Sequence, residues 1–113
     1  MKIPTAPARF DVNDMRRRLG DDDELISTVL QLFVEHCPNQ LGAVKAAVDA
    51  DHVDAVRRSA HLLKGSAGTV GAAGLVDAAT ALELAAEQGD NSLFAHCYAT
   101  LAAEVEQLLD ELN

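Results

Sequence analysis

The sequence is poor in aromatic side chains, in proline and in positive charge, and each shortage narrows what the chain can be. Aromatic residues make up only 4% of the 113 residues, whereas 49% are hydrophobic, so the core must be built from aliphatic side chains. All three prolines lie before residue 39, although a β-sandwich would need turn residues every ~8–12 positions. The sequence therefore predicts an all-α protein with a single domain.

The shortage of basic residues and of cysteine excludes several kinds of partner. Nine Lys and Arg stand against 18 Asp and Glu, a formal net charge of −9 that should repel nucleic acid and anionic lipid. Two cysteines are too few for a disulfide framework and match no zinc spacing. No apolar run reaches the ~18 residues of a membrane span, and no signal-peptide core is present. We expect a cytoplasmic monomer with no nucleic-acid partner and no membrane insertion.

Apolar residues recur at helical spacing through most of the chain. Residues 1–9 lack this periodicity and contain two prolines, so we expect a flexible lead-in, followed by a helical bundle over residues 10–113. A short helix from Asp11 to Leu19 should end at Gly20. The acidic run from Asp21 to Glu24 should then cap a long helix rather than bind a metal ion. Short connections predict an antiparallel up-and-down four-helix bundle with the short helix added at its N-terminus.

The boundaries of the longer helices follow from caps and breakers. Pro38 lies inside the apolar stripe that runs from Ile26 to Val48, and it should kink or break the second helix. Asp51 should cap the third helix, with Asp54 in the capping-box position. The fourth helix should run over about residues 72–88. Asp90 or Asn91 should cap the fifth, whose apolar residues are Leu93, Leu101, Val105, Leu108 and Leu112.

The third helix has two unlike faces. At 100° per residue its apolar residues share one side: Val53, Val56, Ala60, Leu63, Ala67 and Val70. His61 points away from the centre of this stripe, with Arg57 and Lys64 about one turn before and after it. Gly65 and Gly68 lie near the ring, although each glycine inside a helix costs about 1 kcal/mol relative to alanine. We interpret them as clearing the surface around the imidazole; alternatively, Gly65 ends the helix as a C-cap.

An exposed imidazole is a nucleophile near neutral pH. The neighbouring cations Arg57 and Lys64 could orient and steady an anion bound to the ring, and a phosphoryl group is the obvious candidate. They would not catalyse its formation. The glycines at 65, 68, 71 and 74 form no Walker or kinase glycine loop. The pattern therefore predicts an exposed histidine that could hold a phosphoryl group, in a chain with no kinase activity of its own.

The segment from Ala60 to Gly71 resembles the signature of histidine-containing phosphotransfer (Hpt) domains, H-x-x-K-G-[SA]. His61, Lys64, Gly65 and Ser66 match this motif fully, and a weaker likeness extends from Phe10 to about Leu112. The resemblance implies a phosphorelay intermediate of two-component signalling, whose partners are response-regulator receiver domains and a hybrid sensor kinase. His61 would accept a phosphoryl group through Nε2 from a receiver aspartyl phosphate and pass it to another receiver.

The resemblance also implies which groups this chain supplies for the transfer and which groups the receiver domain supplies. Lys64 would favour the phosphate and Gly65 would give access to the ring. The receiver would bring Mg²⁺ and most of the catalytic machinery, so we expect no cofactor and no metal site on this chain. Two alternatives remain open: a phosphoacceptor domain of a larger hybrid or chemotaxis-type histidine kinase, or a helical adaptor without chemistry.

The antiparallel arrangement suggests further site residues. If the chain turns near residues 70–72, His61 is level with Leu82 or Glu83, and Glu83 could accept a hydrogen bond from Nδ1–H. The alternative is a solvated surface charge.

Leu62 lies off the core stripe but close to the histidine, so it is the best candidate for a docking patch. The other candidate partner-binding residues are Arg57, Ser66 and Gly68. The surplus apolar residues of the second helix, Leu25, Val29, Leu32 and Val34, are interpreted mainly as buried; alternatively, some of them form the docking patch together with Leu62. His36, His52 and His96 are interpreted as surface or boundary residues.

Overall fold

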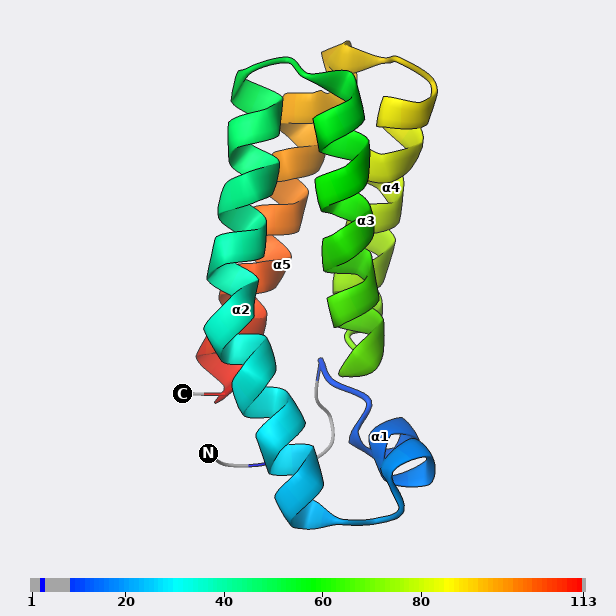
Figure 1. Ribbon diagram of the computed structural model, residues 1–113, viewed down its shortest axis with the longest axis vertical. Coiled ribbons are helices and arrows are strands. Elements are labelled where there is room, and N and C mark those ends of the chain that lie inside the picture. Colours follow the sequence, from blue (N-terminus) through cyan, green and yellow to red (C-terminus); the bar gives the residue numbers. More distant parts are fainter. Residues whose placement is uncertain (1–2, 4–8, 113) are drawn as a thin grey trace.

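The computed structural model describes residue 3 and residues 9–112, which form a bundle of helices (Figure 1). In chain order its helices are α1 (Val12–Leu19), α2 (Asp23–Asp49), α3 (Val53–Thr69), α4 (Ala73–Glu87), a short 3-10 helix η1 (Asn91–Leu93) and α5 (Phe94–Leu112). The four long helices α2 to α5 run up and down, and α1 lies across the lower end of the bundle (Figure 1). The predicted all-α four-helix bundle with a short N-terminal helix is confirmed.

The predicted lead-in falls mostly on residues 1–2 and 4–8, which lie outside the described residues, as does residue 113. Ile3 is partly buried against the core. The backbone N–H of Arg9 donates to the carboxylate of Glu111 near the end of α5, with an N–O distance of 3.0 Å. The bundle boundary at residue 10 therefore stays a prediction.

Aliphatic side chains fill the core, as the composition predicts. Leu30 of α2, Leu63 of α3, Leu82 of α4 and Leu101 of α5 are all fully buried, and burying one leucine stabilises a fold by roughly 1.5–3 kcal/mol. Two residues assigned to core stripes are exposed instead, Val53 by 36% and Leu93 by 42%. Val53 is the first residue of α3 and Leu93 belongs to η1, so each lies where the chain enters a helix at the end of the bundle.

The second helix is continuous through Pro38, so of the two expected outcomes, a kink or a break, the break does not occur. α2 extends over 27 residues, and its lower part inclines away from its upper part in Figure 1. Proline removes one backbone hydrogen bond and usually costs about 3 kcal/mol inside a helix. Pro38 itself is exposed, whereas Cys37 before it and Val44 after it are buried. Packing on both sides of the proline holds the helix together.

The cap of α3 is His52, not Asp51 as predicted. The Nδ1 atom of His52 accepts a hydrogen bond from the backbone N–H of Ala55, at 3.2 Å. Asp51 takes a left-handed conformation with a φ of 54°, and its carboxylate accepts from the side-chain amide of Asn91 at 2.9 Å. Asp51 therefore joins the α2–α3 connection to the α4–α5 connection and leaves the capping position to its neighbour. The predicted capping-box role of Asp54 is therefore wrong too, because it required Asp51 as the N-cap.

The other caps follow the sequence more closely. Asp11 caps α1, Gly20 ends it in the left-handed conformation, and Asp22 caps α2, so the acidic run acts at a helix start as predicted. Asp90 precedes η1, but its side chain makes no cap hydrogen bond. α5 starts only at Phe94, after this extra turn, so the prediction that Asp90 or Asn91 caps the fifth helix is wrong.

Helix α1 holds the turn that ends α3. The backbone N–H of Asp11 donates to the carbonyl of Gly71 at 2.9 Å, and a guanidinium N–H of Arg18 donates to the carbonyl of Thr69 at 2.9 Å. Gly71 has a φ of 67°, and a Cβ atom there would lie 2.7 Å from the Cβ of Asp11. Only glycine fits both this backbone conformation and this close approach. The C-terminal end of α3 is thus fixed from outside the bundle.

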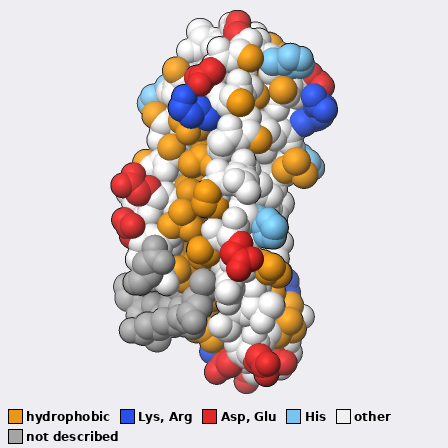
Figure 2. Space-filling view, turned by 60° about the vertical axis from the view of Figure 1, so that its left-hand side comes forward, with side chains coloured by type: hydrophobic (Ala, Val, Ile, Leu, Met, Phe, Trp, Pro, Cys, Tyr) orange, Lys and Arg blue, Asp and Glu red, His pale blue; other side chains and the backbone are white. Residues whose placement is uncertain are grey.

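The face formed by the α2 side of the bundle is partly apolar. Figure 2 shows hydrophobic side chains in a strip along this face, bordered by acidic groups. The partly buried apolar side chains of α2 and α5 are Val29, Val34, Leu41, Val48, Cys97, Tyr98 and Leu109. Within the described part of the chain, no helix combines the length and the apolar character needed to cross a membrane.

Candidate functional site around His61

His61 lies near the middle of α3 and faces the solvent. Its side chain is 62% exposed, whereas Ala60 beside it and Leu63 two positions on are fully buried. The predicted outward orientation is confirmed. It arises because the buried residues of α3 repeat every three or four positions and leave position 61 on the opposite side of the helix.

The imidazole of His61 contacts Glu83 of the neighbouring helix α4. The distance from Nδ1 of His61 to Oε2 of Glu83 is 2.6 Å. Antiparallel packing of α3 on α4 places these positions level, and the contact expected from that register is present. The alternative, a solvated surface charge, is wrong, because Glu83 is only 8% exposed and is the buried charged residue among those described.

Lys64 binds the other oxygen of the same carboxylate. Its Nζ lies 2.5 Å from Oε1 of Glu83, and its side chain is 31% exposed. The hydrogen bond from Lys64 is the main cause that lowers the pKa of the Glu83 carboxyl below its ordinary value; burial opposes this effect and the hydrogen bond with His61 adds to it. Glu83 is therefore ionised at neutral pH.

The ionised carboxylate decides which ring nitrogen carries the proton. A carboxylate oxygen can only accept a hydrogen bond, so Nδ1 of His61 must be the donor in its contact with Glu83. In the neutral ring, Nε2 then has a free lone pair. Because the side chain is largely exposed, this lone pair belongs to the accessible part of the molecule. The site thus presents Nε2 as a nucleophile, because the contact of Nδ1 with Glu83 fixes the tautomer of the ring.

Two glycines leave the helix surface beside the ring bare. Gly65 and Gly68 both lie inside α3, which continues to Thr69, so the alternative in which Gly65 ends the helix is wrong. A Cβ atom added at either position would meet nothing within 4 Å. Neither glycine is required by close packing against the described part of the chain. Their effect is to lower the surface next to His61.

Arg57 points toward an acid on its own helix. One of its guanidinium nitrogens lies 3.0 Å from the carboxylate of Asp54, and Arg58 binds the other oxygen of that carboxylate at 3.0 Å. The two arginines hold the pKa of Asp54 below its ordinary value, with the hydrogen bond from Arg57 as the largest cause. Of the two cations expected beside the ring, the structure brings Lys64 to the His61–Glu83 pair and places Arg57 in an ion pair one turn away.

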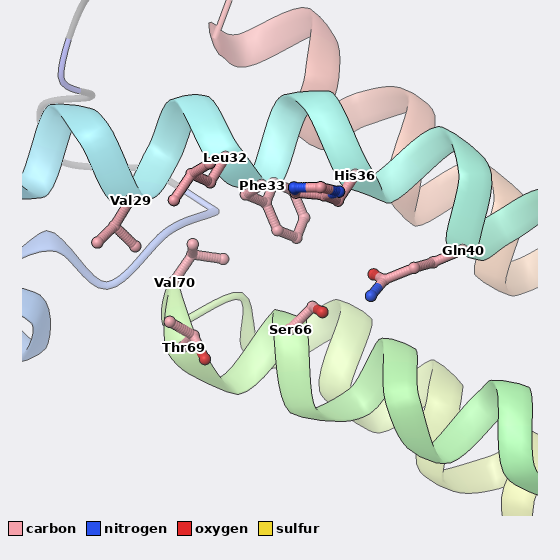
Figure 3. A pocket seen from close by; sticks show the side chains of 8 residues that line it. All are labelled: Val29, Leu32, Phe33, His36, Gln40, Ser66, Thr69 and Val70. Atoms are coloured by element: carbon pink, nitrogen blue, oxygen red, sulfur yellow. The ribbon is translucent and has the colours of Figure 1, made fainter.

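A groove between α2 and α3 lies beside this site and was not predicted. One part has a volume of about 240 Å³ and receives the side chains labelled in Figure 3: Val29, Leu32, Phe33, His36, Gln40, Ser66, Thr69 and Val70. A second part of about 210 Å³ shares His36 and Gln40 with the first and adds Leu62. We call the two parts together the α2–α3 groove. Its sequence signal is the small side chains Ser59 and Ser66 on the side of α3 that faces α2.

The groove accounts for part of the surplus apolar surface. Leu25 and Leu32 are 41% and 47% exposed, so the interpretation of the surplus residues as mainly buried is wrong for these two. Val29 and Leu32 line the groove, Leu62 borders it and is 64% exposed, and Ser66 lies on its α3 side. The neutral Oε1 atom of Gln40 is buried there without a hydrogen-bond partner among the described residues. Leu62 and Ser66 are thus brought together at the groove, while Gly68 lies exposed on the histidine side of α3.

No group of three or more His, Cys, Asp or Glu side chains that could hold a metal ion occurs in residues 9–112 or at residue 3. His36, His52 and His96 lie on separate helices or caps. The chemical resources of the site are therefore one nucleophile, one carboxylate and one ammonium group.

Comparison with known proteins agrees with this arrangement. The sequence profile of the Hpt domain matches residues 28–112, so the chain belongs to the Hpt family of phosphotransfer proteins, which act as phosphocarriers in two-component phosphorelays. Membership implies interaction with receiver domains and kinases. A comparison with curated protein sequences gives no match.

A solved structure shares the fold over nearly its whole length. It is the crystal structure of histidine-containing phosphotransfer protein B (HptB) from Pseudomonas aeruginosa PAO1, with a TM-score of 0.83. The alignment covers 94% of this chain and 91% of that chain at 23% sequence identity. At this identity the likeness establishes the fold, and the site must be argued from the residues of this chain.

Proposed function

We propose that this protein accepts a phosphoryl group on Nε2 of His61 from the aspartyl phosphate of one receiver domain and passes it to another. The observation that carries this proposal is the exposed imidazole whose Nδ1 is bound to a buried carboxylate. That contact leaves Nε2 as the reactive nitrogen. The proposed function depends on the exposure and orientation of the His61 ring rather than on a catalytic group of this chain.

The proposed transfer needs no general base. The lone pair of Nε2 attacks the phosphorus atom, the acyl-phosphate P–O bond breaks, and its electron pair leaves with the receiver aspartate. Lys64 lies one turn from His61 on α3, close enough to attract the oxygens of the transferred group. A magnesium ion held by the receiver would supply further charge neutralisation. We propose that this chain binds no metal or cofactor of its own and does not form phosphohistidine without an external phosphoryl donor.

The receiver would dock over the open face of α3 and the α2–α3 groove. Leu62 offers an exposed apolar contact, Ser66 lies beside it, and the bare backbone at Gly65 and Gly68 admits a bulky partner to the ring. Docking could also supply a hydrogen-bond donor to Oε1 of Gln40, which has none among the described residues. Arg57 lies at the margin of this surface, where its rim charge would influence the rate of encounter more than the affinity.

The proposal covers a free-standing relay protein and a phosphoacceptor domain of a larger histidine kinase alike, because the step at His61 is the same in both. The adaptor alternative differs, since it requires binding without phosphohistidine. We favour the relay because an adaptor has no need for a carboxylate that fixes the tautomer of an exposed histidine.

A two-stage transfer experiment tests the proposal. A receiver domain labelled on its aspartate is incubated with the protein, and a second, unlabelled receiver is then added. Label should appear on the protein as acid-labile, alkali-stable phosphate and then move to the second receiver. The matched variant His61→Gln should bind the receivers but take no label. If His61→Gln is labelled as well as the wild type, the assignment of His61 is wrong.

A further inference from the structure

Glu83 carries more charge than its orienting role requires. A glutamine at this position could also accept a hydrogen bond from Nδ1–H through its amide oxygen and fix the same tautomer. Burial disfavours the ionised carboxylate, which is 8% exposed, and its ion pair with Lys64 offsets this cost. The negative charge at position 83 is therefore not needed for the tautomer of the free ring and is available for a second role.

The protonation state of the His61 ring during transfer indicates what the negative charge of Glu83 does. Before transfer the neutral ring of His61 has a proton on Nδ1 and a lone pair on Nε2. When Nε2 forms its bond to phosphorus, the Nδ1 proton stays in place and the ring becomes a cationic phosphoimidazolium. During onward transfer a receiver carboxylate attacks the phosphorus, the P–N bond breaks, and its electron pair returns to Nε2. The neutral ring is recovered, and no proton has moved in either step.

This cycle fails if the phosphorylated ring loses its Nδ1 proton. Breaking the P–N bond would then have to release an imidazolate anion, which is a far poorer leaving group than neutral imidazole. A free imidazole ring titrates close to physiological pH, so this loss must be prevented by the surroundings. An adjacent carboxylate favours the protonated cation through its charge and its hydrogen bond.

We infer that the Glu83 carboxylate keeps the Nδ1 proton on the ring while His61 carries the phosphoryl group, and so keeps the phosphohistidine competent for onward transfer. This inference rests on the proposed function. Glu83 is thus a positioning residue, which acts through the imidazole and does not touch the phosphoryl group.

The surrounding charges indicate that the interaction between the Glu83 carboxylate and the imidazole strengthens when His61 is phosphorylated. Lys64 occupies Oε1 of Glu83 in the free protein, while Oε2 faces Nδ1 of His61. A phosphoryl group on Nε2 would share the Lys64 ammonium with Glu83, which would weaken the Lys64–Glu83 pair without breaking it and let the carboxylate interact more strongly with the ring. Other charges on the same two helices are the Arg57–Asp54 pair, which begins one turn before His61 on α3, and the exposed Glu87, one turn after Glu83 on α4.

The test measures protonation of phosphorylated His61 directly. The protein is loaded with phosphoramidate, a small phosphoryl donor that needs no receiver, and NMR of the isotope-labelled imidazole nitrogens follows the ring through a pH titration. The Glu83→Gln variant should lose the Nδ1 proton at a pH about one unit lower than the wild type. Glu87→Gln removes the same charge one turn away without touching the contact, and it should titrate with the wild type.

The transfer rate gives a second measurement of the same effect. From phospho-His61 to a receiver, the wild-type rate should stay nearly constant between pH 6 and pH 8, while the Glu83→Gln rate should fall about tenfold more across this range. Lys64→Gln frees the carboxylate for the ring and should raise the protonation midpoint, a change of opposite sign.

Equal midpoints for Glu83→Gln and Glu87→Gln would overturn the inference, and so would a midpoint that falls in Lys64→Gln. If Glu83→Gln does not fold, as judged by its circular dichroism, Lys64→Gln decides the matter alone. Failure of the proposed function is a different result: a receiver would then leave His61 unlabelled, although phosphoramidate still loads the ring.

Discussion

The two faces of α3 are built under different constraints. On one face Val56, Ala60, Leu63 and Ala67 are fully buried, and their side-chain volumes must fit the neighbouring helices α2 and α4. On the other face the ring of His61 needs reach and a clear approach, and the helix there contains glycine, which weakens it. One helix therefore combines a face selected for packing with a face selected for access, and positions only one residue apart obey opposite rules.

The largest predicted effect is a difference in stability between alanine variants of the adjacent residues Leu62 and Leu63. Leu63→Ala removes a fully buried side chain and should reduce the free energy of unfolding by about 2–5 kcal/mol. Leu62→Ala removes a side chain that is 64% exposed and should change it by less than about 0.5 kcal/mol. Denaturant unfolding measures both values.

The same pair should respond in reverse in a transfer assay. At temperatures where both variants are folded, Leu62→Ala should raise the receiver concentration needed for half-maximal transfer, whereas Leu63→Ala should leave it unchanged. Equal stability losses in the two variants would remove the distinction between the faces.

The access argument predicts the next largest effect. Gly65→Leu places a branched side chain beside the ring, and it should slow transfer about 100-fold, since small misplacements of reacting groups have effects of this size. The helix should be at least as stable, because leucine is a better helix former than glycine. Gly42→Leu on α2 is the matched control, as a Cβ there also meets nothing within 4 Å. A transfer rate in Gly65→Leu equal to that of the control would dismiss the role of the bare surface.

Lys64 should have a smaller effect on rate. Lys64→Ala removes the ammonium group that can attract the phosphoryl oxygens, and transfer from a receiver should slow about tenfold, which corresponds to about 1.4 kcal/mol. Lys45→Ala provides the comparison, since Lys45 is likewise paired with an acid, Asp49, at 2.7 Å but lies on α2. Single-turnover kinetics should show the loss only for Lys64. Equal rates in the two variants would exclude Lys64 from the site.

The smallest predicted effect concerns stability in acid. The pKa of Glu83 is lower in the folded protein than in the unfolded chain, so its contribution to stability is complete above the unfolded value of about 4.3 and is lost as the pH falls through the folded value. Glu83→Gln should therefore be less stable than the wild type at pH 7 by about 1 kcal/mol. The difference should shrink below pH 4 in parallel denaturation curves. A difference that is constant from pH 7 to pH 3 would show that the carboxylate charge contributes nothing.

The fold and the central site residues follow from local rules. Helical periodicity places the buried stripe of α3, and with it the exposed position of His61. The fixed rise per residue in two antiparallel helices then places Glu83 level with the ring. This contact could be predicted because it needs only the register of two helices and the position of one turn.

The missed features depend on competition between neighbours. Asp51 and His52 can both cap α3, and the choice is decided by the hydrogen bonds of Asp51 with Asn91 in another connection. The cost of Pro38 is offset by packing that the local sequence does not show. The α2–α3 groove is the volume left between two helices, which depends on their separation and on small side chains such as Ser66. None of these can be read from one segment alone.

The most direct test of the account locates the phosphoryl group. The protein is phosphorylated by a receiver, kept at alkaline pH, and fragmented for mass spectrometry so that each of its four histidines is assigned separately. We expect one phosphoryl group per chain, on His61. A phosphoryl group on His36, His52 or His96, or none on any histidine, would contradict the claim that the open face of α3 is the site of transfer.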